Sequence, residues 1–189
     1  MPAGKERARL VPMLPAELET ERLLLRAPLP ADAHEIFAGY AQMAEVTRFM
    51  MWRPHASLSV TEAYVAQCIA AFENGVRLPY VVAMRGEPAV AIGMLEARPA
   101  GHIVELGYVL APRHWGEGLM PEAIAARTAR ILADAVLFRV QAFCDVENRP
   151  SQRALEKAGF MREARLARFA IHPNLSEEPR PCYMYARWR

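Results

Sequence analysis

The sequence has few of the residues that mark a disulfide-stapled or metal-binding protein. Its 189 residues include only three cysteines, Cys68, Cys144 and Cys182, which are far apart and form no Cys-x-x-Cys pair. The five histidines show no ligand spacing either, so we expect neither a disulfide framework nor a metal site. The 23 basic and 21 acidic side chains nearly balance. This balance gives no electrostatic reason to expect binding to nucleic acid or to an anionic membrane.

Long hydrophobic runs are missing as well. No segment approaches the roughly 20 apolar residues that a membrane-spanning helix needs. The first residues carry positive charge, but prolines and Glu6 interrupt them, which argues against a signal peptide. A chain of 189 residues with 53% hydrophobic residues can build one core. We therefore expect a cytoplasmic protein, monomeric or homodimeric, with a flexible leader over residues 1–17 and one domain over residues 18–189.

Apolar runs and turn residues predict strands and helices in a mixed order. Strands are expected over residues 21–26, 79–85, 89–96, 102–110, 137–144, 160–171 and 182–188. Helices are expected over residues 31–40, 59–73, 120–135 and 149–158, with one short helical turn within 43–55. The order indicates antiparallel strands, then a strand–helix–strand crossover, then a final antiparallel pair. This predicts an α/β domain of the α+β type, with a mixed, largely antiparallel central sheet and helices on both faces.

Three local patterns refine this prediction. Ser59 and Glu62 have the spacing of a capping box, which would open the helix that Asn74 and Gly75 close. Residues 86–88 have the composition of a hairpin turn. The helix after residue 118 is expected to group Met120, Ile124, Ile131 and Ala135 on one face and to place Glu122, Arg127, Arg130 and Asp134 elsewhere.

The most informative segment is a loop with two glycines between a strand and a helix. The strand ends at Pro112, and Gly116 and Gly118 precede the helical pattern. Free amides and the positive end of the helix dipole meet at such a point, and glycine lets a diphosphate approach the backbone. The loop lacks the third glycine of a dinucleotide fingerprint and the Gly-Lys-Ser/Thr of a P-loop. Alone, it is compatible with an anion site or with an ordinary turn.

A second segment, residues 148–160, reads as a short helix with defined ends. Asn148 is an N-cap candidate, Pro150 fits the first turn, and Gly159 is a stop signal. The helix should be about ten residues long and should lead directly into a strand.

Together, these segments resemble the GNAT acetyltransferases. Arg113, Gly116 and Gly118 match the pattern Arg/Gln-x-x-Gly-x-Gly/Ala, and residues 148–160 resemble Asn-x-x-Ser-x-x-x-Leu/Tyr-x-Lys-x-Gly-Phe. Residues 21–26 and 46–54 resemble the RimJ/RimL-like branch, which contains the ribosomal-protein N-terminal acetyltransferases. The resemblance extends from about residue 18 to residue 189. It implies the GNAT fold, with a sheet splayed at the acetyl-CoA site, and an enzyme that uses acetyl-CoA without a metal.

The resemblance also implies which residues bind the coenzyme. The glycine loop would hold the diphosphate, the strand before it would pair with the pantetheine amides, and Asn148 would bind pantetheine from the other side. The expected coenzyme-binding residues are Val109, Leu110, Arg113, His114, Trp115, Gly116, Glu117, Gly118, Leu119, Asn148, Ser151 and Lys157. Glu117 departs from the expected chemistry because its carboxylate opposes the ligand's charge. We expect its side chain to face solvent and its amide to face inward.

An amine acceptor arrives as an ammonium group and must lose a proton before it attacks. Glu105 is the expected catalytic base and a substrate contact, because it shares a strand face with Val109; a merely polar edge residue is the alternative. Leu155 occupies the position of the superfamily's usual tyrosine acid. Either Ser151, Tyr183, Tyr185 or water replaces that acid, or the coenzyme A thiolate leaves unprotonated.

Two loops are expected to wall the acceptor pocket, residues 50–53 and 171–178. Met51 and Trp52 are the substrate candidates, with core packing as the alternative. The expected function is direct transfer of an acetyl group to a primary amine in a ternary complex, with a protein N-terminal α-amine favoured over a small-molecule amine. No Cys/His or Ser/His pair points to an acyl-enzyme. The alternative is a non-catalytic acyl-CoA-binding module on the same fold.

Overall fold

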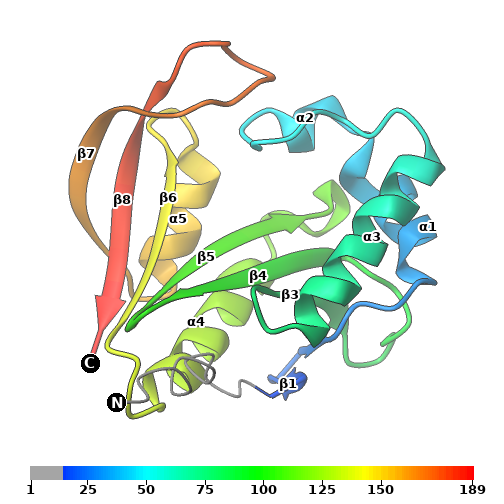
Figure 1. Cartoon of the computed structure of the whole chain (residues 1–189), viewed down its shortest axis with the longest axis horizontal. Coiled ribbons are helices and arrows are strands. Elements are labelled where there is room, and N and C mark those ends of the chain that lie inside the picture. The colour runs from blue at the N-terminus through cyan, green and yellow to red at the C-terminus, as the bar shows by residue number, and fades with distance from the viewer. Residues whose placement is uncertain (1–14) are drawn as a thin grey trace, which may run out of the picture.

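The computed structural model describes residues 15–189, in which one eight-stranded sheet organises the chain (Figure 1). The strands are β1 (Glu17–Glu19), β2 (Leu23–Arg26), β3 (Leu78–Met84), β4 (Gly93–Ala100), β5 (Ile103–Leu110), β6 (Arg139–Asp145), β7 (Met161–Ala170) and β8 (Arg180–Trp188). The helices are α1 (Asp32–Ile36), α2 (Ala44–Thr47), α3 (Leu58–Glu73), α4 (Leu119–Leu132) and α5 (Arg149–Lys157), with a π-helical turn η1 (Phe37–Ala41) and a 3-10 turn η2 (Pro112–His114).

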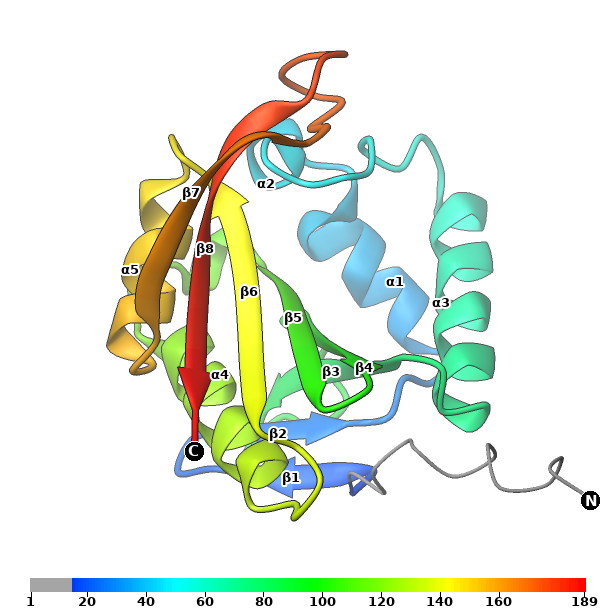
Figure 2. The ribbon, with the colours of Figure 1, turned by 60° about the vertical axis from the view of Figure 1, so that its left-hand side comes forward.

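The sheet order is β1-β2-β3-β4-β5-β6-β8-β7, and every neighbouring pair is antiparallel except β5 and β6. In Figure 2, α1 and α3 cover one face of the sheet while α4 and α5 cover the other. Each face has its own buried cluster, one with α4 and α5 and one with α1 and α3. The predicted fold class is therefore confirmed. None of the helices within residues 15–189 has both the length and the apolar character needed to cross a membrane.

The central feature of the sheet is a splay between its two parallel strands. β5 and β6 pair only at their first residues, Ile103 with Arg139 through Glu105 with Gln141. Beyond that point the two strands diverge, as Figure 2 shows. Among residues 15–189, the later part of β5 therefore has a neighbouring strand on its β4 side but none on its β6 side. A splay of this kind leaves backbone groups available to a ligand.

Several boundaries differ from the prediction. β1 was not predicted, and it places the domain boundary expected at residue 18 inside a strand; residues 1–14 of the expected leader lie outside the described residues. The strand predicted over residues 89–96 corresponds to β4, which begins and ends four residues later. The turn bonds from Glu87 N to Met84 O and from Val90 N to Glu87 O occupy the earlier segment. The new register sets Leu95 opposite Tyr80 in the core.

The capping-box prediction at Ser59 is wrong. α3 begins at Leu58 after Ser57, without a side-chain cap, so Ser59 and Glu62 lie inside the first turns. The Ser59 hydroxyl instead lies 2.8 Å from the Ser57 hydroxyl. The predicted stop at Asn74 and Gly75 is confirmed, since Asn74 is the C-cap and Gly75 has a φ of 67°.

The prediction that Arg127 lies away from the apolar face of its helix is also wrong, because its side chain is fully buried. Residues 120, 124, 127 and 131 follow the spacing of one helix face, so helical geometry places Arg127 on the apolar side despite its charge. Its guanidinium stacks 3.7 Å above the centroid of the Tyr80 ring. Burial lowers its pKa to about 9, and no described residue hydrogen-bonds to it. Ala135, expected on the same face, lies beyond the end of α4 at Leu132.

A buried ion pair connects β2 to α1. Arg26 and Asp32 are 7% and 2% exposed, and two bonds of 2.9 and 2.6 Å join the guanidinium to both carboxylate oxygens. The Leu29 amide also donates to Asp32 at 2.6 Å. The pair therefore fixes the chain where it leaves the sheet.

We predict that Asp32→Ala destabilises the protein by about 3–5 kcal/mol, because it leaves a buried guanidinium without its counter-charge. Urea unfolding followed by circular dichroism measures the loss. His34→Ala on the exposed side of α1 is the control and should change stability by at most about 0.5 kcal/mol. Equal stability of the two variants would contradict the importance of the pair.

Candidate active site

Two cavities meet at the splay between β5 and β6. The loop-side cavity, about 530 Å³, lies between the glycine loop, α4 and α5. The strand-side cavity, about 170 Å³, lies between β4, β5 and the segment that joins α2 to α3. Both cavities are lined by Phe49, Met50, Tyr108, Val109, Asn148 and Ser151. Two ligands bound in the two cavities would therefore meet at this junction.

The glycine loop has the geometry of an anion site. Gly116 and Gly118 have φ values of 84° and 78°, in the left-handed region that glycine adopts without strain. Gly118 is the N-cap of α4, and the amides of Leu119 and Met120 in the first turn have no acceptor within the helix. The indole of Trp115 donates to the Leu110 carbonyl at 2.8 Å and ties the loop to β5. The loop therefore offers free amides and a helix dipole to the larger cavity.

A polar brace supports this loop from the turn between β1 and β2. Glu122 in the first turn of α4 accepts bonds from the Thr20 hydroxyl at 2.6 Å and from the amide and guanidinium of Arg22 at 3.0 and 2.7 Å. Arg22 also donates to the Glu117 carbonyl at 3.0 Å. Partial burial opposes ionisation of Glu122, but these hydrogen bonds outweigh it and lower its pKa. The Glu122 carboxylate thus holds Arg22 in the position from which its guanidinium binds the loop backbone at Glu117.

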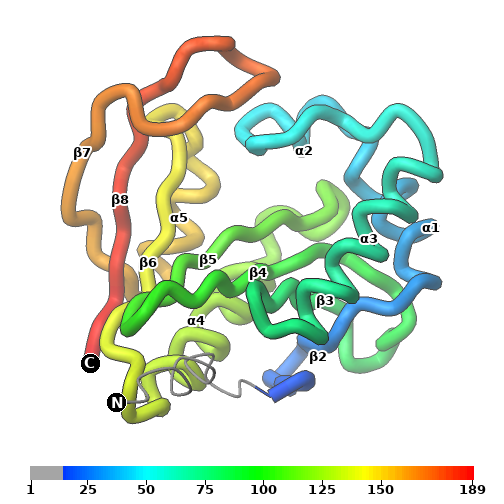
Figure 3. The backbone as a smooth tube through the Cα atoms, viewed as in Figure 1, coloured from blue at the N-terminus to red at the C-terminus, as the bar shows by residue number. Residues whose placement is uncertain are grey.

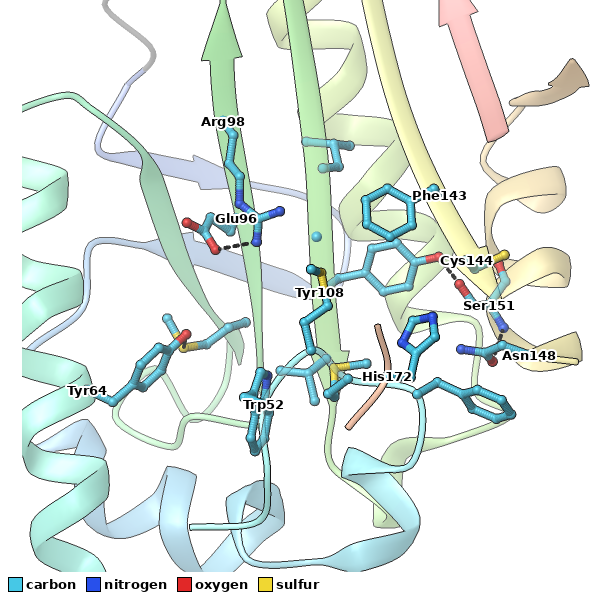
Figure 4. A pocket seen from close by; sticks show the side chains of 17 residues that line it. Trp52, Tyr64, Glu96, Arg98, Tyr108, Phe143, Cys144, Asn148, Ser151 and His172 are labelled. Atoms are coloured by element: carbon cyan, nitrogen blue, oxygen red, sulfur yellow. Dashed lines mark hydrogen bonds and ion pairs between the residues drawn. The ribbon is translucent and has the colours of Figure 1, made fainter. Parts of the chain in front are cut away.

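The N-terminal end of α5 lies on the other side of the junction. The Asn148 side chain caps the helix by accepting from the Ser151 amide at 3.2 Å, as predicted. Ser151 Oγ lies 2.7 Å from the hydroxyl of Tyr108, so this pair of side chains spans the splay (Figure 4). Burial raises the pKa of Tyr108, which keeps its hydroxyl protonated and able to donate. Sequence reasoning missed Tyr108, although it precedes the expected coenzyme residue Val109.

The floor of the strand-side cavity carries a charged cluster on β4. Glu96 accepts from Arg77 at 2.9 Å and from Arg98 at 3.0 Å, one on each carboxylate oxygen. Arg98 also reaches Glu105 at 3.3 Å. Glu96 and Arg98 line the cavity, and Figure 4 shows them on the side opposite Ser151. Sequence reasoning named neither residue as part of the site, and Arg98 lay beyond the predicted strand, which ended at residue 96.

The loop between β7 and β8 forms the roof of the strand-side cavity. The Asn174 amide donates to the carbonyls of Thr47 and Trp52 at 2.7 and 2.8 Å, and Figure 3 shows the two segments side by side. His172 lines the cavity and is 2% exposed, with Nε2 3.8 Å from Asp145. Burial lowers its pKa despite the nearby carboxylate of Asp145. His172 is therefore buried in the cavity wall.

Most of the predicted coenzyme residues lie on the loop-side cavity. Its lining includes Val109, Leu110, His114, Trp115, Gly116, Gly118, Leu119, Asn148, Ser151 and Lys157. Arg113 and Glu117 do not line it, and the Glu117 side chain is 48% exposed, in the expected direction. Arg153, which was not predicted, joins Lys157 one helical turn away on α5 and adds a second cation to the cavity.

The predicted catalytic and acceptor residues separate into two groups. Met51 and Trp52 line the strand-side cavity, whereas Glu105 lines neither cavity. Its role as the base therefore stays a prediction without geometric support. Leu155 is fully buried in the core, and Tyr183 and Tyr185 also line neither cavity. Ser151 is thus the one acid candidate from the sequence that reaches the junction.

Within residues 15–189, no group of three or more histidine, cysteine, aspartate or glutamate side chains could hold a metal ion. The loop-side cavity instead suits a long ligand with an anionic end. Left-handed glycines and helix amides face its loop end, and the free edge of β5 and the Asn148 side chain lie at its other end. These features fit coenzyme A, whose diphosphate and pantetheine need those two kinds of contact.

Comparisons with known proteins agree with this geometry. Residues 22–161 match the family model of the acetyltransferase (GNAT) domain. YoaA of Bacillus subtilis, an uncharacterised N-acetyltransferase, is 27% identical over 154 residues, which are 80% of this chain and 86% of YoaA. The crystal structure of a GNAT-family acetyltransferase from Bacillus anthracis matches with a TM-score of 0.79 and 25% identity, over 91% of this chain and 98% of that one.

A third comparison concerns a solved complex. The ribosomal L7/L12 α-N-protein acetyltransferase RimL, in complex with coenzyme A, matches with a TM-score of 0.77. The identity is 19%, over 92% of this chain and 96% of RimL, so this likeness shows the fold alone.

We predict that Gly118→Asp weakens coenzyme A binding at least about tenfold, or about 1.4 kcal/mol. The new carboxylate would repel the diphosphate, and the left-handed backbone disfavours a side chain. Gly101→Asp is a matched control, because Gly101 has a φ of 61° and open space in the turn between β4 and β5. Calorimetry should show normal affinity for the control. Unchanged affinity of a folded Gly118→Asp variant would exclude the loop from the site.

Proposed function

Because the chain belongs to the GNAT acetyltransferase family, we propose that it moves the acetyl group of acetyl-CoA directly to a primary amine in a ternary complex. The observation that carries this proposal is the junction of the two cavities at Tyr108, Val109 and Ser151. One cavity has the features of a coenzyme site, and the other has polar groups on an apolar wall. His172 in the strand-side cavity lies 3.8 Å from the sulfur of Cys182, but Cys182 is fully buried and lines neither cavity, so this pair does not indicate an acyl-enzyme.

We assign residues to each step of the transfer. The amides of the glycine loop and the first turn of α4 hold the diphosphate, and the free edge of β5 pairs with pantetheine. The amine enters from the strand-side cavity, loses a proton and attacks the thioester carbonyl. A carbon–nitrogen bond forms, the carbon–sulfur bond breaks, and the sulfur keeps the electron pair. Ser151 can donate its hydroxyl proton to that sulfur and take one up from water, while the Tyr108 hydroxyl, 2.7 Å away, holds the serine in position.

We propose a protein N-terminal α-amine as the acceptor, with a small-molecule amine as the alternative. The likeness to RimL motivates the first choice, since that protein is described as an α-N-protein acetyltransferase. The strand-side cavity supports either, because about 170 Å³ is below the roughly 300–1,000 Å³ of a drug-sized ligand site. It would take one terminal residue or one compact amine.

Acetyl transfer to a defined panel tests the function. We expect acetyl-CoA to acetylate peptides with a free α-amine, with release of free coenzyme A and a mass increase at the first residue. N-terminally blocked peptides with a free lysine, and small aliphatic amines, form the comparison arms. Acetylation only in those arms would assign a different acceptor. Binding of acetyl-CoA with no transfer in any arm would favour a non-catalytic module.

We expect Ser151→Ala to lower kcat by more than about tenfold, or about 1.4 kcal/mol of barrier, while coenzyme A binds normally. Tyr108→Phe should cause a smaller loss, because it removes the partner of the Ser151 hydroxyl but keeps the hydroxyl itself. Ser59→Ala, on α3 away from both cavities, is the control. An unaffected Ser151→Ala variant would instead indicate that coenzyme A leaves as the thiolate.

A further inference from the structure

We propose that Glu96 is the carboxylate that binds the acceptor's ammonium group and takes its proton. This inference rests on the proposed function and assigns its acceptor end to a residue on β4. Within residues 15–189, Glu96 is the one carboxylate that lines the strand-side cavity. The residue expected to be the base, Glu105, lies on β5 outside that lining.

The two arginines hold Glu96 in a fixed position. Arg77 binds one carboxylate oxygen at 2.9 Å and Arg98 binds the other at 3.0 Å, while Glu96 itself is 8% exposed. An ionised carboxylate accepts about four hydrogen bonds, so each oxygen keeps capacity for an incoming N–H group. The carboxylate is therefore oriented before the ligand arrives, which lowers the entropic cost of binding.

Arg98 has a second carboxylate within reach. Its Nη1 atom lies 3.3 Å from Glu105, while its Nη2 atom binds Glu96. When an ammonium group approaches Glu96, Arg98 can shift toward Glu105 without losing all of its counter-charge. Glu105 is thus a positioning residue for Arg98, and Glu96 makes the contact with the amine.

Gly107 brings this cluster next to the reaction junction. A Cβ atom at position 107 would lie 3.2 Å from Nη2 of Arg98, so the guanidinium occupies the space above a residue without a side chain. Gly107 immediately precedes Tyr108 and Val109, which line both cavities. The charged cluster consequently borders the place where the amine must attack.

Aromatic rings complete a site for a cation. Trp52 and Tyr64 line the cavity, and His55 packs between them with ring centroids 5.1 and 5.7 Å away. Ring faces attract ammonium groups, and a carboxylate supplies the counter-charge. The Tyr64 hydroxyl lies 3.8 Å from the sulfur of Met94, a weak contact that a ligand could replace. The acceptor class is a primary ammonium group on a compact, apolar body.

The proton balance follows from this placement. One N–H bond of the ammonium group breaks, its proton passes to the Glu96 carboxylate, and the nitrogen keeps the electron pair that forms the bond to the acetyl carbon. Glu96 then returns the proton to water through the open side of the cavity, where Arg98 is 44% exposed. After the attack, the nitrogen loses a second proton to the freed Glu96 carboxylate or to water and becomes the neutral amide. The sulfur of coenzyme A leaves with the other electron pair, as described above.

Two variants with the same change of charge test the proposal. Both Glu96→Gln and Glu105→Gln remove a partner of Arg98, but only Glu96 lines the cavity. We expect Glu96→Gln to lower kcat/KM for the amine by at least about 100-fold, with acetyl-CoA affinity unchanged. The loss should shrink at high pH, where more of the amine is already neutral. Glu105→Gln should lose much less and keep the wild-type pH profile.

A binding measurement makes the test independent of acetyl transfer. Benzylammonium is titrated by calorimetry into protein saturated with coenzyme A, with benzyl alcohol as the uncharged control. We expect wild type and Glu105→Gln to bind benzylammonium more tightly than benzyl alcohol, and Glu96→Gln to lose that preference. If the protein acetylates no amine of the panel, the proposed function is contradicted. The titration tests the role of Glu96 in amine binding whether or not the protein shows activity.

The proposal is overturned if folded Glu96→Gln keeps wild-type amine kinetics and its preference for benzylammonium. It is also overturned if Glu105→Gln shows the larger, pH-dependent loss, which would make Glu105 the base. If Glu96→Gln does not fold, Glu96→Asp decides, because it keeps the charge between the arginines and withdraws it by one methylene. We expect Glu96→Asp to lose at least about tenfold in kcat/KM for the amine; wild-type kinetics would reject the role of Glu96.

Discussion

Beyond Glu105 and Gln141, β5 and β6 no longer pair, and both cavities exist because of this divergence. A paired strand at this place would use the backbone groups of β5 and would fill the space between the strands. The splay has a cost, since unpaired backbone groups in a sheet lose their hydrogen bonds. That cost is offset when a ligand with its own amide groups pairs with β5 in place of the missing strand.

Side-chain contacts across the splay keep it at a fixed width. Tyr108 from β5 meets Ser151 from α5, and Trp115 returns to the Leu110 carbonyl. On the acceptor side, Asn174 donates to two carbonyls of the segment between α2 and α3. These contacts come from segments that the sheet alone would not hold together. They make the junction a pre-formed site, in which little ordering is left for the ligands to induce.

The parts of the site that the sequence predicted are those that depend on local backbone geometry. Gly116 and Gly118 adopt left-handed conformations before a helix, and Asn148 caps α5 by its own side chain. Such features depend on neighbours within a few residues, so a short pattern is sufficient to find them. The prediction of Glu105 as the base depended instead on strand-face alternation. Alternation places Glu105 on one face of β5, but it does not reveal which residues of other strands, such as Arg98, lie next to it.

Glu96, Arg98 and Arg127 were missed for related reasons. A four-residue error in the position of β4 left Arg98 outside the predicted strand, so its place beside Glu105 could not be derived. Arg127 has the spacing of the apolar face of α4, but the prediction placed it elsewhere because it is charged. Its stacking on Tyr80 connects residues 47 positions apart, which no local pattern reveals. Fold class, by contrast, needed only the order of the elements.

The two ends of the proposed site also offer different physical means of recognition. The coenzyme end relies on backbone amides and a helix dipole, which many sequences can supply if glycines stand at the right positions. The proposed acceptor end is lined instead by side chains from four separate segments, represented by Trp52, Tyr64, Glu96 and His172. Each of these can change without disturbing the glycine loop. The glycine loop and α5 carry the pattern shared with the family, whereas under our proposal the choice of amine would depend on the charged and aromatic groups around Glu96. Those groups are the ones that experiments on the acceptor should vary.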